Sequence, residues 1–275
     1  MHHIVTDGWS MTVLWRELAV LYGAFRAGRP SPLPELPLQY ADYAVRQREE
    51  LAGETLAASL AYWKQALAGL SPLDLPTDRS RPALASHEGG IVRFEVDAGI
   101  AQALKALARR ERATTFMVLL AAFQVLLHRY TGQEDIAVGV PIAGRSRPEL
   151  EPLIGFFVNM LVMRTDLGGR PGFDALLRRV RQRALEAYEH QALPFETIVT
   201  ALSPVRETTR NPLFGVSFAF HGAEPGAWGL PGIAVEPVED AFGSVGAKSS
   251  ESVKSAGMIA IRSDITIASS REWVM

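Results

Sequence analysis

The chain has 275 residues, of which 48% are hydrophobic and 21% charged, the composition of a folded protein rather than of a disordered one. With 28 Lys and Arg against 30 Asp and Glu, the formal net charge is −2, which argues against nucleic acid as a partner. The chain has no cysteine, so disulfides, a cysteine nucleophile and cysteine-ligated metal sites are excluded.

The N-terminus has neither a basic start nor an apolar stretch of signal-peptide length. The most apolar run, residues 116–127, is too short to cross a bilayer core of about 30 Å and predicts a buried helix. We therefore expect a cytoplasmic protein without a membrane partner.

The first third of the chain patterns as helices after a short strand. Residues 2–5 are predicted to end a strand. An amphipathic helix that stops at Gly28 follows, because apolar residues recur at spacings of three or four on one face: Leu14, Leu18, Leu21 and Phe25. After the proline-rich loop 29–40, one or two helices are expected within 39–69. The second loop, 71–86, predicts the main domain boundary.

Beyond that loop, strands alternate with long helices, which is typical of an α/β or α+β protein. Asp97 and Thr114 are candidate helix caps. Strands are predicted at 91–96, 135–143, 156–167, 213–221 and 232–239, and helices at 98–110, 114–132 and 173–189.

From residue 241 the pattern changes. Residues 241–257 are rich in Ser and Gly, and residues 259–275 alternate only weakly. We expect residues 241–275 to be an atypical, non-native tail that packs poorly and leaves the 213–221 strand with an exposed edge.

The strongest chemical signal lies in residues 2–8, where His2 and His3 precede Asp7 and Gly8. By chance, these four residues at this spacing arise on the order of once in a million positions. Successive side chains on a strand point to opposite faces, so the two histidines are expected to have different tasks and not to share a metal ion.

This H-H-x-x-x-D-G motif, followed by GWSM, resembles the signature of the condensation domains of nonribosomal peptide synthetases, in the chloramphenicol-acetyltransferase-like superfamily. In the block HQALPFE, Ala192 stands where the family has an acid. The blocks that agree in order and spacing are residues 40–44, 75–79, 154–159, 190–196 and 210–214.

The resemblance implies an α/β fold of two acetyltransferase-like lobes, each a two-layer sandwich, around a tunnel. On that basis, residues 1–86 are the remnant of the N-terminal, donor-side lobe with its connector, and residues 87–240 are the C-terminal lobe. The second lobe is then nearly complete and the first is mostly missing. A single chain of this kind is expected to be inactive.

The resemblance also implies the reaction. Donor and acceptor peptidyl carrier proteins, working beside an adenylation domain, present thioesters on 4'-phosphopantetheine arms, and the acceptor amine attacks the donor carbonyl. His3 is then the catalytic residue, because imidazole can accept a proton near neutral pH. No intrinsic cofactor or metal is expected.

The other motif residues are implied to be structural. His2 faces the body of the lobe, Asp7 pairs with Arg145, and Gly8 is expected to permit a backbone angle or close approach that a Cβ blocks. Trp9 and Asn159 are candidates for lining the tunnel.

Two further residues are expected to be structural: His190, at a helix end, and Arg210. Three alternative functions stay open: an epimerisation domain, a stand-alone acyltransferase of the same superfamily, and a non-catalytic remnant that only binds carrier proteins. The residues Gly8-Trp9-Ser10-Met11 favour condensation over epimerisation.

Overall fold

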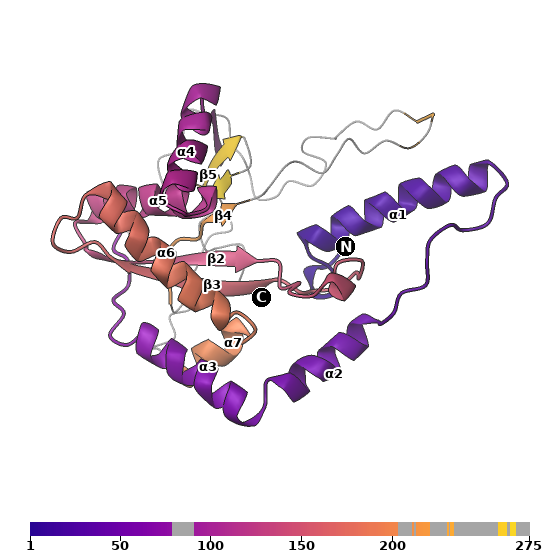
Figure 1. Cartoon of the computed structure of the whole chain (residues 1–275), viewed down its shortest axis with the longest axis horizontal. Coiled ribbons are helices and arrows are strands. Elements are labelled where there is room, and N and C mark those ends of the chain that lie inside the picture. The colour runs from indigo at the N-terminus through magenta and orange to yellow at the C-terminus, as the bar shows by residue number, and fades with distance from the viewer. Residues whose placement is uncertain are drawn as a thin grey trace. The chain divides into compact units, whose positions relative to one another are not determined.

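The structure is a computed structural model, and it describes residues 1–78, 91–202, 211, 213–220, 230, 232–233, 258–262 and 265–267 (Figure 1). The chain divides into two compact units. The first comprises Met1–Ala57, Ile142–Asn159 and Ala223–Ala241, and the second comprises Ala58–Pro141, Met160–Gly222 and Phe242–Met275. This division differs from the expected boundary in the 71–86 loop, and the assignment of segments to two lobes stays a prediction.

The first unit begins with a short 3-10 helix, η1 (His3–Val5), where a strand end was expected. The prediction of a strand is wrong because the backbone N–H groups of Val5 and Thr6 bond locally to the carbonyls of His2 and His3. His2 caps this turn, since its Nδ1 accepts the N–H of Ile4 at 3.1 Å.

The predicted helix follows as α1 (Gly8–Arg26), with Asp7 as its N-cap. The expected apolar face is not the buried one: Leu18 is 43% exposed and Phe25 60% exposed, whereas Ser10 and Val13 are buried. Tertiary hydrogen bonds to Ser10 decide which face turns inward, and the spacing of leucines cannot show them.

The remainder of the first unit packs around a small apolar cluster. Gln39 and Asp42 form a capping box that starts α2 (Tyr40–Glu50). A second 3-10 helix, η2 (Pro148–Leu150), lies in the segment 142–159. The cluster joins buried side chains of both segments, with Leu36, Tyr40 and Tyr43 packed against it: Leu38, Leu150, Leu153 and Phe157.

The second unit contains most of the predicted core. Its helices are α3 (Gly53–Ala66, which begins in the first unit), α4 (Ala98–Arg110), α5 (Thr115–Thr131), α6 (Phe173–Glu189) and α7 (Phe195–Leu202). Asp97 and Thr114 cap α4 and α5 as predicted, and Gly132, at φ +72°, ends α5. Helix α5 packs between α4 and α6.

The buried strands of this unit are β2 (Asp135–Ile142) and β3 (Asn159–Asp166), which pair with each other. Ile136, Val138 and Leu161 are fully buried, as the continuous apolar runs predicted. Arg164 binds Asp135 through two nitrogens and also donates to the carbonyls of Ala66 and Ala68, which fastens the end of α3 to the sheet.

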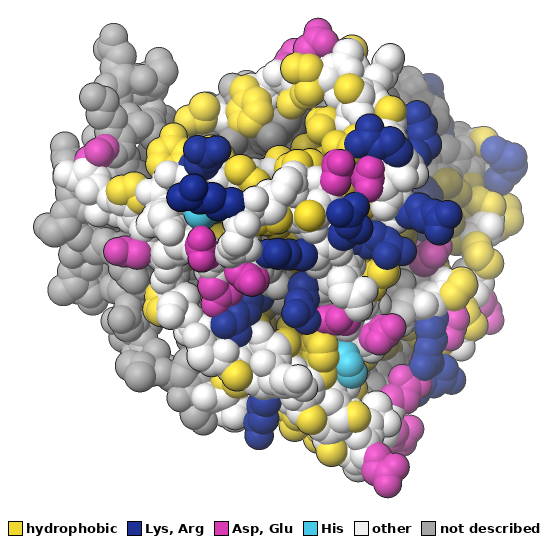
Figure 2. Space-filling view, turned by 60° about the vertical axis from the view of Figure 1, so that its left-hand side comes forward, with side chains coloured by type: hydrophobic (Ala, Val, Ile, Leu, Met, Phe, Trp, Pro, Cys, Tyr) yellow, Lys and Arg dark blue, Asp and Glu magenta, His cyan; other side chains and the backbone are white. Residues whose placement is uncertain are grey.

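Helix α6 carries its charged residues outward. Arg178, Arg179 and Arg183 form ion pairs with Glu111, Asp166 and Glu186, respectively. On the face that Figure 2 shows, basic and acidic side chains lie interspersed, so this face has no extended field of one sign.

A four-stranded sheet completes the described part of the second unit, in the order β1-β5-β6-β4. Its strands are β1 (Ile91–Glu95), β4 (Ala219–Phe220), β5 (Met258–Arg262) and β6 (Ile265–Ile267). Strand β5 runs parallel to β1 and antiparallel to β6, and β6 runs antiparallel to β4.

This pairing bears on the expected tail. Ala219 and Phe220 of the 213–221 strand pair with β6 on one side, and β4 is the end strand of this sheet, so the expected exposed edge stays a prediction. Whether residues 241–275 are the native end of the fold stays a prediction. Residues 241–257 and all of the predicted strand 232–239 except its first two residues lie outside the described residues.

The segment before β4 approaches β2 unusually closely. Gly139 exchanges backbone hydrogen bonds with Val216 and Phe218, at 3.0 and 2.8 Å, and a Cβ on Gly139 would lie 2.4 Å from the ring of Phe214. Any side chain at this position therefore has to displace a buried aromatic ring.

We predict that Gly139→Ala lowers the free energy of unfolding by about 1–3 kcal/mol, the usual cost of overpacking a core. The matched control is Gly215→Ala, because a Cβ there meets only ordinary contacts, at 3.7 Å from the Leu73 carbonyl oxygen. Urea denaturation of the three proteins measures the difference. Equal losses of stability in both variants would show that the Phe214 ring does not restrict the size of the residue at position 139.

Candidate functional site

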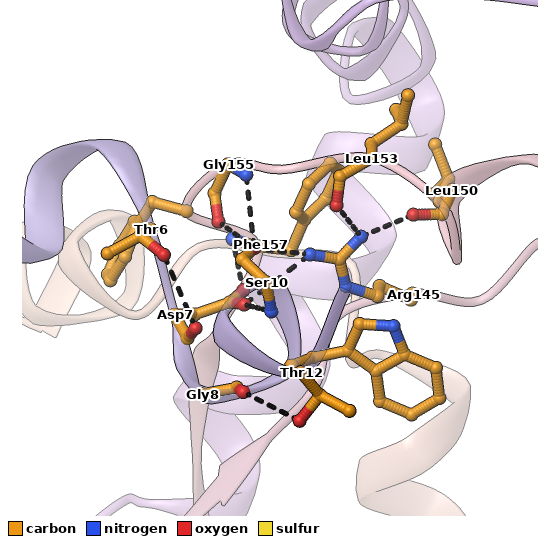
Figure 3. Close-up of polar contacts among 12 residues, drawn as sticks. Thr6, Asp7, Gly8, Ser10, Thr12, Arg145, Leu150, Leu153, Gly155 and Phe157 are labelled. Carbon is orange, nitrogen blue, oxygen red and sulfur yellow. Dashed lines mark hydrogen bonds and ion pairs between the residues drawn. The ribbon is translucent and has the colours of Figure 1, made fainter. Parts of the chain in front are cut away.

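The carboxylate of Asp7 joins η1, α1 and the segment 142–159 of the first unit (Figure 3). Its Oδ1 accepts the backbone N–H of Ser10 at 2.8 Å, which caps α1. Its Oδ2 accepts the N–H of Phe157 at 2.9 Å. One buried side chain thus holds two segments that are 150 residues apart in sequence.

Arg145 is the predicted partner of Asp7, and the structure places them together. The Nη2 of Arg145 lies 3.4 Å from Asp7 Oδ1, and the two side chains are only 1% and 5% exposed. A buried charge without a partner is costly, so this pair explains how both residues are tolerated in the interior.

The guanidinium of Arg145 is held from several sides. Its Nη1 donates to the carbonyls of Leu150 and Leu153, and its Nη2 donates to Ser10 Oγ at 2.8 Å. Its Cζ stacks 3.9 Å above the centroid of the Phe157 ring. Its Nε has no hydrogen-bond partner among the described residues.

Ser10 is a member of this network that the sequence analysis did not single out as a site residue. Its Oγ donates to the Gly155 carbonyl at 2.8 Å and accepts from the Gly155 N–H at 3.1 Å and from Arg145. The hydroxyl therefore uses its one hydrogen and both lone pairs. The serine of GWSM was visible in the motif, but only as a family marker.

Two glycines make these contacts possible. Gly144 has φ +65°, and a Cβ there would lie 1.8 Å from the Phe157 carbonyl oxygen. A Cβ on Gly155 would lie 2.1 Å from the ring of Tyr40. The segment that carries Arg145 can therefore pass close to the motif only with glycine at both positions.

The electrostatics of the pair follow from this geometry. Burial by itself raises the pKa of Asp7, but the N–H groups of Ser10 and Phe157 and the Arg145 charge together hold it below its ordinary value. Burial lowers the pKa of Arg145, and the charge of Asp7 partly offsets that effect. Both groups are ionised at neutral pH.

Aromatic residues close the network. The hydroxyl of Tyr40 donates to the Phe156 carbonyl at 2.7 Å, and the rings of Tyr40 and Tyr43 pack on Phe157. Burial raises the pKa of Tyr40, and the charge of Asp7 raises it further, so the hydroxyl remains a proton donor. Neither Tyr40 nor Phe156 was predicted as a site residue, because each appeared only within a recognition block.

His3, the expected catalytic residue, lies at the surface of this network. Its Nδ1 is 2.8 Å from the Thr6 carbonyl oxygen. A carbonyl can only accept, so Nδ1 carries the proton, and in the neutral ring Nε2 is the basic nitrogen. The ring also packs edge to face on Phe156, with 5.5 Å between centroids. His2 was expected to face the body of the lobe, but it is exposed and caps η1, because this segment is a turn rather than a strand.

The remaining predicted residues are placed as follows. Gly8 begins α1 without a positive φ, and a Cβ there would meet nothing within 4 Å, so the two expected reasons for a glycine do not hold among the described residues. The indole N–H of Trp9 donates to the Glu151 carbonyl at 2.9 Å, and the side chain is 45% exposed. Asn159 is the first residue of β3 and is half-buried.

His190 lies at the C-cap of α6, the helix end that was predicted. Its ring stacks on Tyr62 at 4.1 Å, and its carbonyl accepts the indole N–H of the buried Trp63 at 3.3 Å. These contacts belong to the second unit and are structural. Burial raises the pKa of Tyr62 to about 12. Arg210 lies outside the described residues.

Within the described residues, no single helix is long and apolar enough to span a membrane, although α4 and α5 together pass on length and composition with a bend of 106° between them. In the same part of the chain, no three His, Cys, Asp or Glu side chains are grouped to hold a metal ion.

Comparisons with known proteins identify the family. The family model "Condensation domain" matches residues 1–236. A linear gramicidin synthase of Brevibacillus parabrevis is 52% identical over 249 residues, which cover 90% of this chain and 3% of that protein. The chain spans 3% to 4% of the length of the three linear gramicidin synthase proteins that it matches.

Solved structures show the same fold. The X-domain from teicoplanin biosynthesis aligns with a TM-score of 0.78 at 31% identity, over 97% of this chain and 61% of that one. A complex of the X-domain and OxyB from teicoplanin biosynthesis aligns with a TM-score of 0.70 at 28% identity, over 82% of this chain and 57% of that one.

The mixed helix-and-sheet fold and the histidine motif anchored by a buried ion pair define a protein of the chloramphenicol-acetyltransferase-like class. Within that class, the chain belongs to the condensation-domain family. It is a condensation domain of the nonribosomal peptide synthetase type.

We predict that Asp7→Asn costs about 3 kcal/mol of stability at neutral pH, because it leaves Arg145 buried without its counter-ion. The folded-state pKa of Asp7 is depressed, so its contribution is fully present above the unfolded value of about 3.9 and is lost as pH falls through the folded value. The gap between wild type and variant in urea denaturation should therefore shrink from pH 7 to pH 3.

The matched control is Arg147→Ala, which removes the ion pair with Glu50 at the surface, where both side chains are roughly half exposed. An exposed pair contributes little to stability, because water and salt screen it. A loss for Asp7→Asn no larger than the control, or one of equal size at both pH values, would contradict the assigned role.

Proposed function

We propose that this condensation domain forms a peptide bond between two carrier-bound substrates, with His3 as the general base. The observation that carries the proposal is the 2.8 Å contact between His3 Nδ1 and the Thr6 carbonyl oxygen. It assigns the proton to Nδ1 and leaves Nε2 as the nitrogen that accepts one.

The chemistry follows from that assignment. The amine of an acceptor aminoacyl thioester attacks the carbonyl of a donor acyl or peptidyl thioester. A C–N bond forms, the C–S bond breaks, the amine's proton passes to His3 Nε2, and the thiol of the donor arm leaves after taking up a proton. A positioned base of this kind contributes about 10²- to 10⁴-fold in rate.

The partners in this proposal are donor and acceptor peptidyl carrier proteins, whose 4'-phosphopantetheine arms carry the substrates, and a neighbouring adenylation domain. The support is that the relatives are long synthetases of which this chain matches only a small part. We propose that Trp9 and Asn159 line the path of the arms: the ring of Trp9 is partly exposed although its N–H is occupied.

Asp7 and Arg145 have a supporting task in this proposal. Both are buried, and the Asp7 carboxylate and the two terminal nitrogens of Arg145 bond to neighbouring protein groups. They hold η1 against the segment 142–159 of the same unit, so that the His3 backbone is fixed before substrate arrives. Neither touches the reacting atoms.

We propose that the isolated chain of 275 residues forms no peptide bond, because it aligns with only 61% of the X-domain structure and a tunnel requires walls on both sides. Mass spectrometry of a mixture of the chain with loaded donor and acceptor carriers should detect no dipeptidyl product. Product that disappears in His3→Ala would overturn the proposed inactivity and support the role of His3.

When the preceding lobe is supplied, we predict that His3→Ala lowers the condensation rate by about 10²-fold or more. His2→Ala is the matched control, because His2 is exposed and only caps η1, so its loss should cost far less. Equal losses of rate in the two variants would show that the two histidines matter because they maintain the structure of η1, and not because His3 acts as a base.

The second candidate function is partner binding without catalysis. It is favoured by the likeness to an X-domain whose structure was solved in complex with OxyB. Titration of the chain with loaded carriers, together with the product assay, separates catalysis from binding alone. If the protein supplied with the preceding lobe binds the carriers but forms no product, the result would support binding without catalysis. An epimerised product or transfer to a free acceptor in that assay would indicate one of the other two alternatives.

A further inference from the structure

Three consecutive residues opposite the histidine motif are each fixed by a hydrogen bond from another element. Gly155 is bonded at both its N–H and its carbonyl by Ser10 Oγ. The carbonyl of Phe156 accepts from the Tyr40 hydroxyl at 2.7 Å, and the N–H of Phe157 donates to Asp7 at 2.9 Å. The backbone of this tripeptide is therefore restrained at every residue.

The two phenylalanines have different environments. Phe157 is 3% exposed and lies in the core beneath Arg145. Phe156 is 37% exposed, and its ring lies against the ring of His3 with an interplanar angle of 89°. A large apolar ring half in solvent adds little to the core, so a contact with the motif is a more specific role for Phe156.

His3 has reason to need such a contact. It lies on η1 and is exposed, and an exposed side chain ordinarily samples several rotamers. In the rotamer that the structure shows, Nδ1 lies 2.8 Å from the Thr6 carbonyl oxygen. An edge-to-face contact on the ring favours one orientation, because aromatic pairs prefer this geometry.

We propose that Phe156 is a positioning residue, which holds the His3 ring in the orientation that bonds Nδ1 to Thr6 and presents Nε2 for proton transfer. The inference rests on the proposed function of His3. The hydrogen bonds that residues 155–157 make with Ser10, Asp7 and Tyr40 fix the position of Phe156, and Phe156 in turn fixes the orientation of the His3 ring. The ion pair thus acts on the histidine through an aromatic side chain.

The test is the protonation state of each His3 nitrogen, measured by long-range ¹H–¹⁵N NMR on the full chain labelled at histidine, at a pH where the ring is neutral. The wild type should show His3 with the proton on Nδ1. In Phe156→Ala, we expect the ratio of that tautomer to the other to fall about 2- to 10-fold, the range that an aromatic pair contributes. The resonance missing from His3→Ala identifies the signal.

Two more variants separate positioning from general stability. Phe156→Tyr keeps the ring and should restore the wild-type spectrum, whereas Phe156→Leu keeps much of the apolar bulk and should not. Tyr40→Phe removes only the hydroxyl that holds the Phe156 carbonyl and should shift the ratio in the same direction by less. Phe25→Ala, on the exposed side of α1, is the control and should leave His3 unchanged.

An unchanged His3 spectrum in Phe156→Ala, or an equal shift in Phe25→Ala, would overturn the proposal. This outcome differs from a failure of the proposed function. If His3→Ala kept full condensation activity while Phe156→Ala still shifted the His3 tautomer, the positioning would stand and the base assignment would fall.

Discussion

The carboxylate of Asp7 lies 3.4 Å from the guanidinium of Arg145, with both side chains almost wholly removed from solvent. Removal of two charges from water is favourable only when their remaining polar atoms are also bonded. Asp7 meets this condition with two backbone N–H groups. Arg145 meets it at Nη1 and Nη2, with two carbonyls and the Ser10 hydroxyl, although its Nε has no partner among the described residues. The arrangement of the first unit follows from this requirement, because the groups come from residues 7–10 and from residues 145–157, which are far apart in sequence.

That requirement also accounts for the glycines around it. The loop with Arg145 must bring its backbone against Phe157 and Tyr40, and a side chain at Gly144 or Gly155 would occupy the space these groups fill. In the second unit, Gly139 has the same function beside Phe214. A backbone carbonyl at Gly144, and an aromatic ring at Gly155 and Gly139, fills the space that a Cβ would need.

The histidine pair shows how buried protein groups can support an exposed imidazole. His2 bonds to the N–H of Ile4 and closes η1, while His3 bonds to the carbonyl of Thr6 and rests on Phe156. Because Thr6 and Asp7 are buried and Phe156 is held by its backbone, an imidazole at the surface rests on a fixed frame. Preorganisation of this kind lowers the entropic cost of aligning a base with its substrate.

Local sequence patterns were sufficient to predict several of the helices of this protein. Apolar periodicity and caps predicted α4, α5 and α6 within a residue or two, since Asp97, Thr114 and Gly132 act on neighbouring backbone groups. The motif residues and their resemblance to a family also led to the Asp7–Arg145 pair.

Other features depended on groups distant in sequence. The turn at 3–5, the buried face of α1, the hub at Ser10, the contact of Phe156 with His3 and the pairing of β4 with β6 were visible only in the tertiary structure. The physical reason is that a polar side chain such as Ser10 turns inward only where a distant carbonyl and guanidinium are there to bond it.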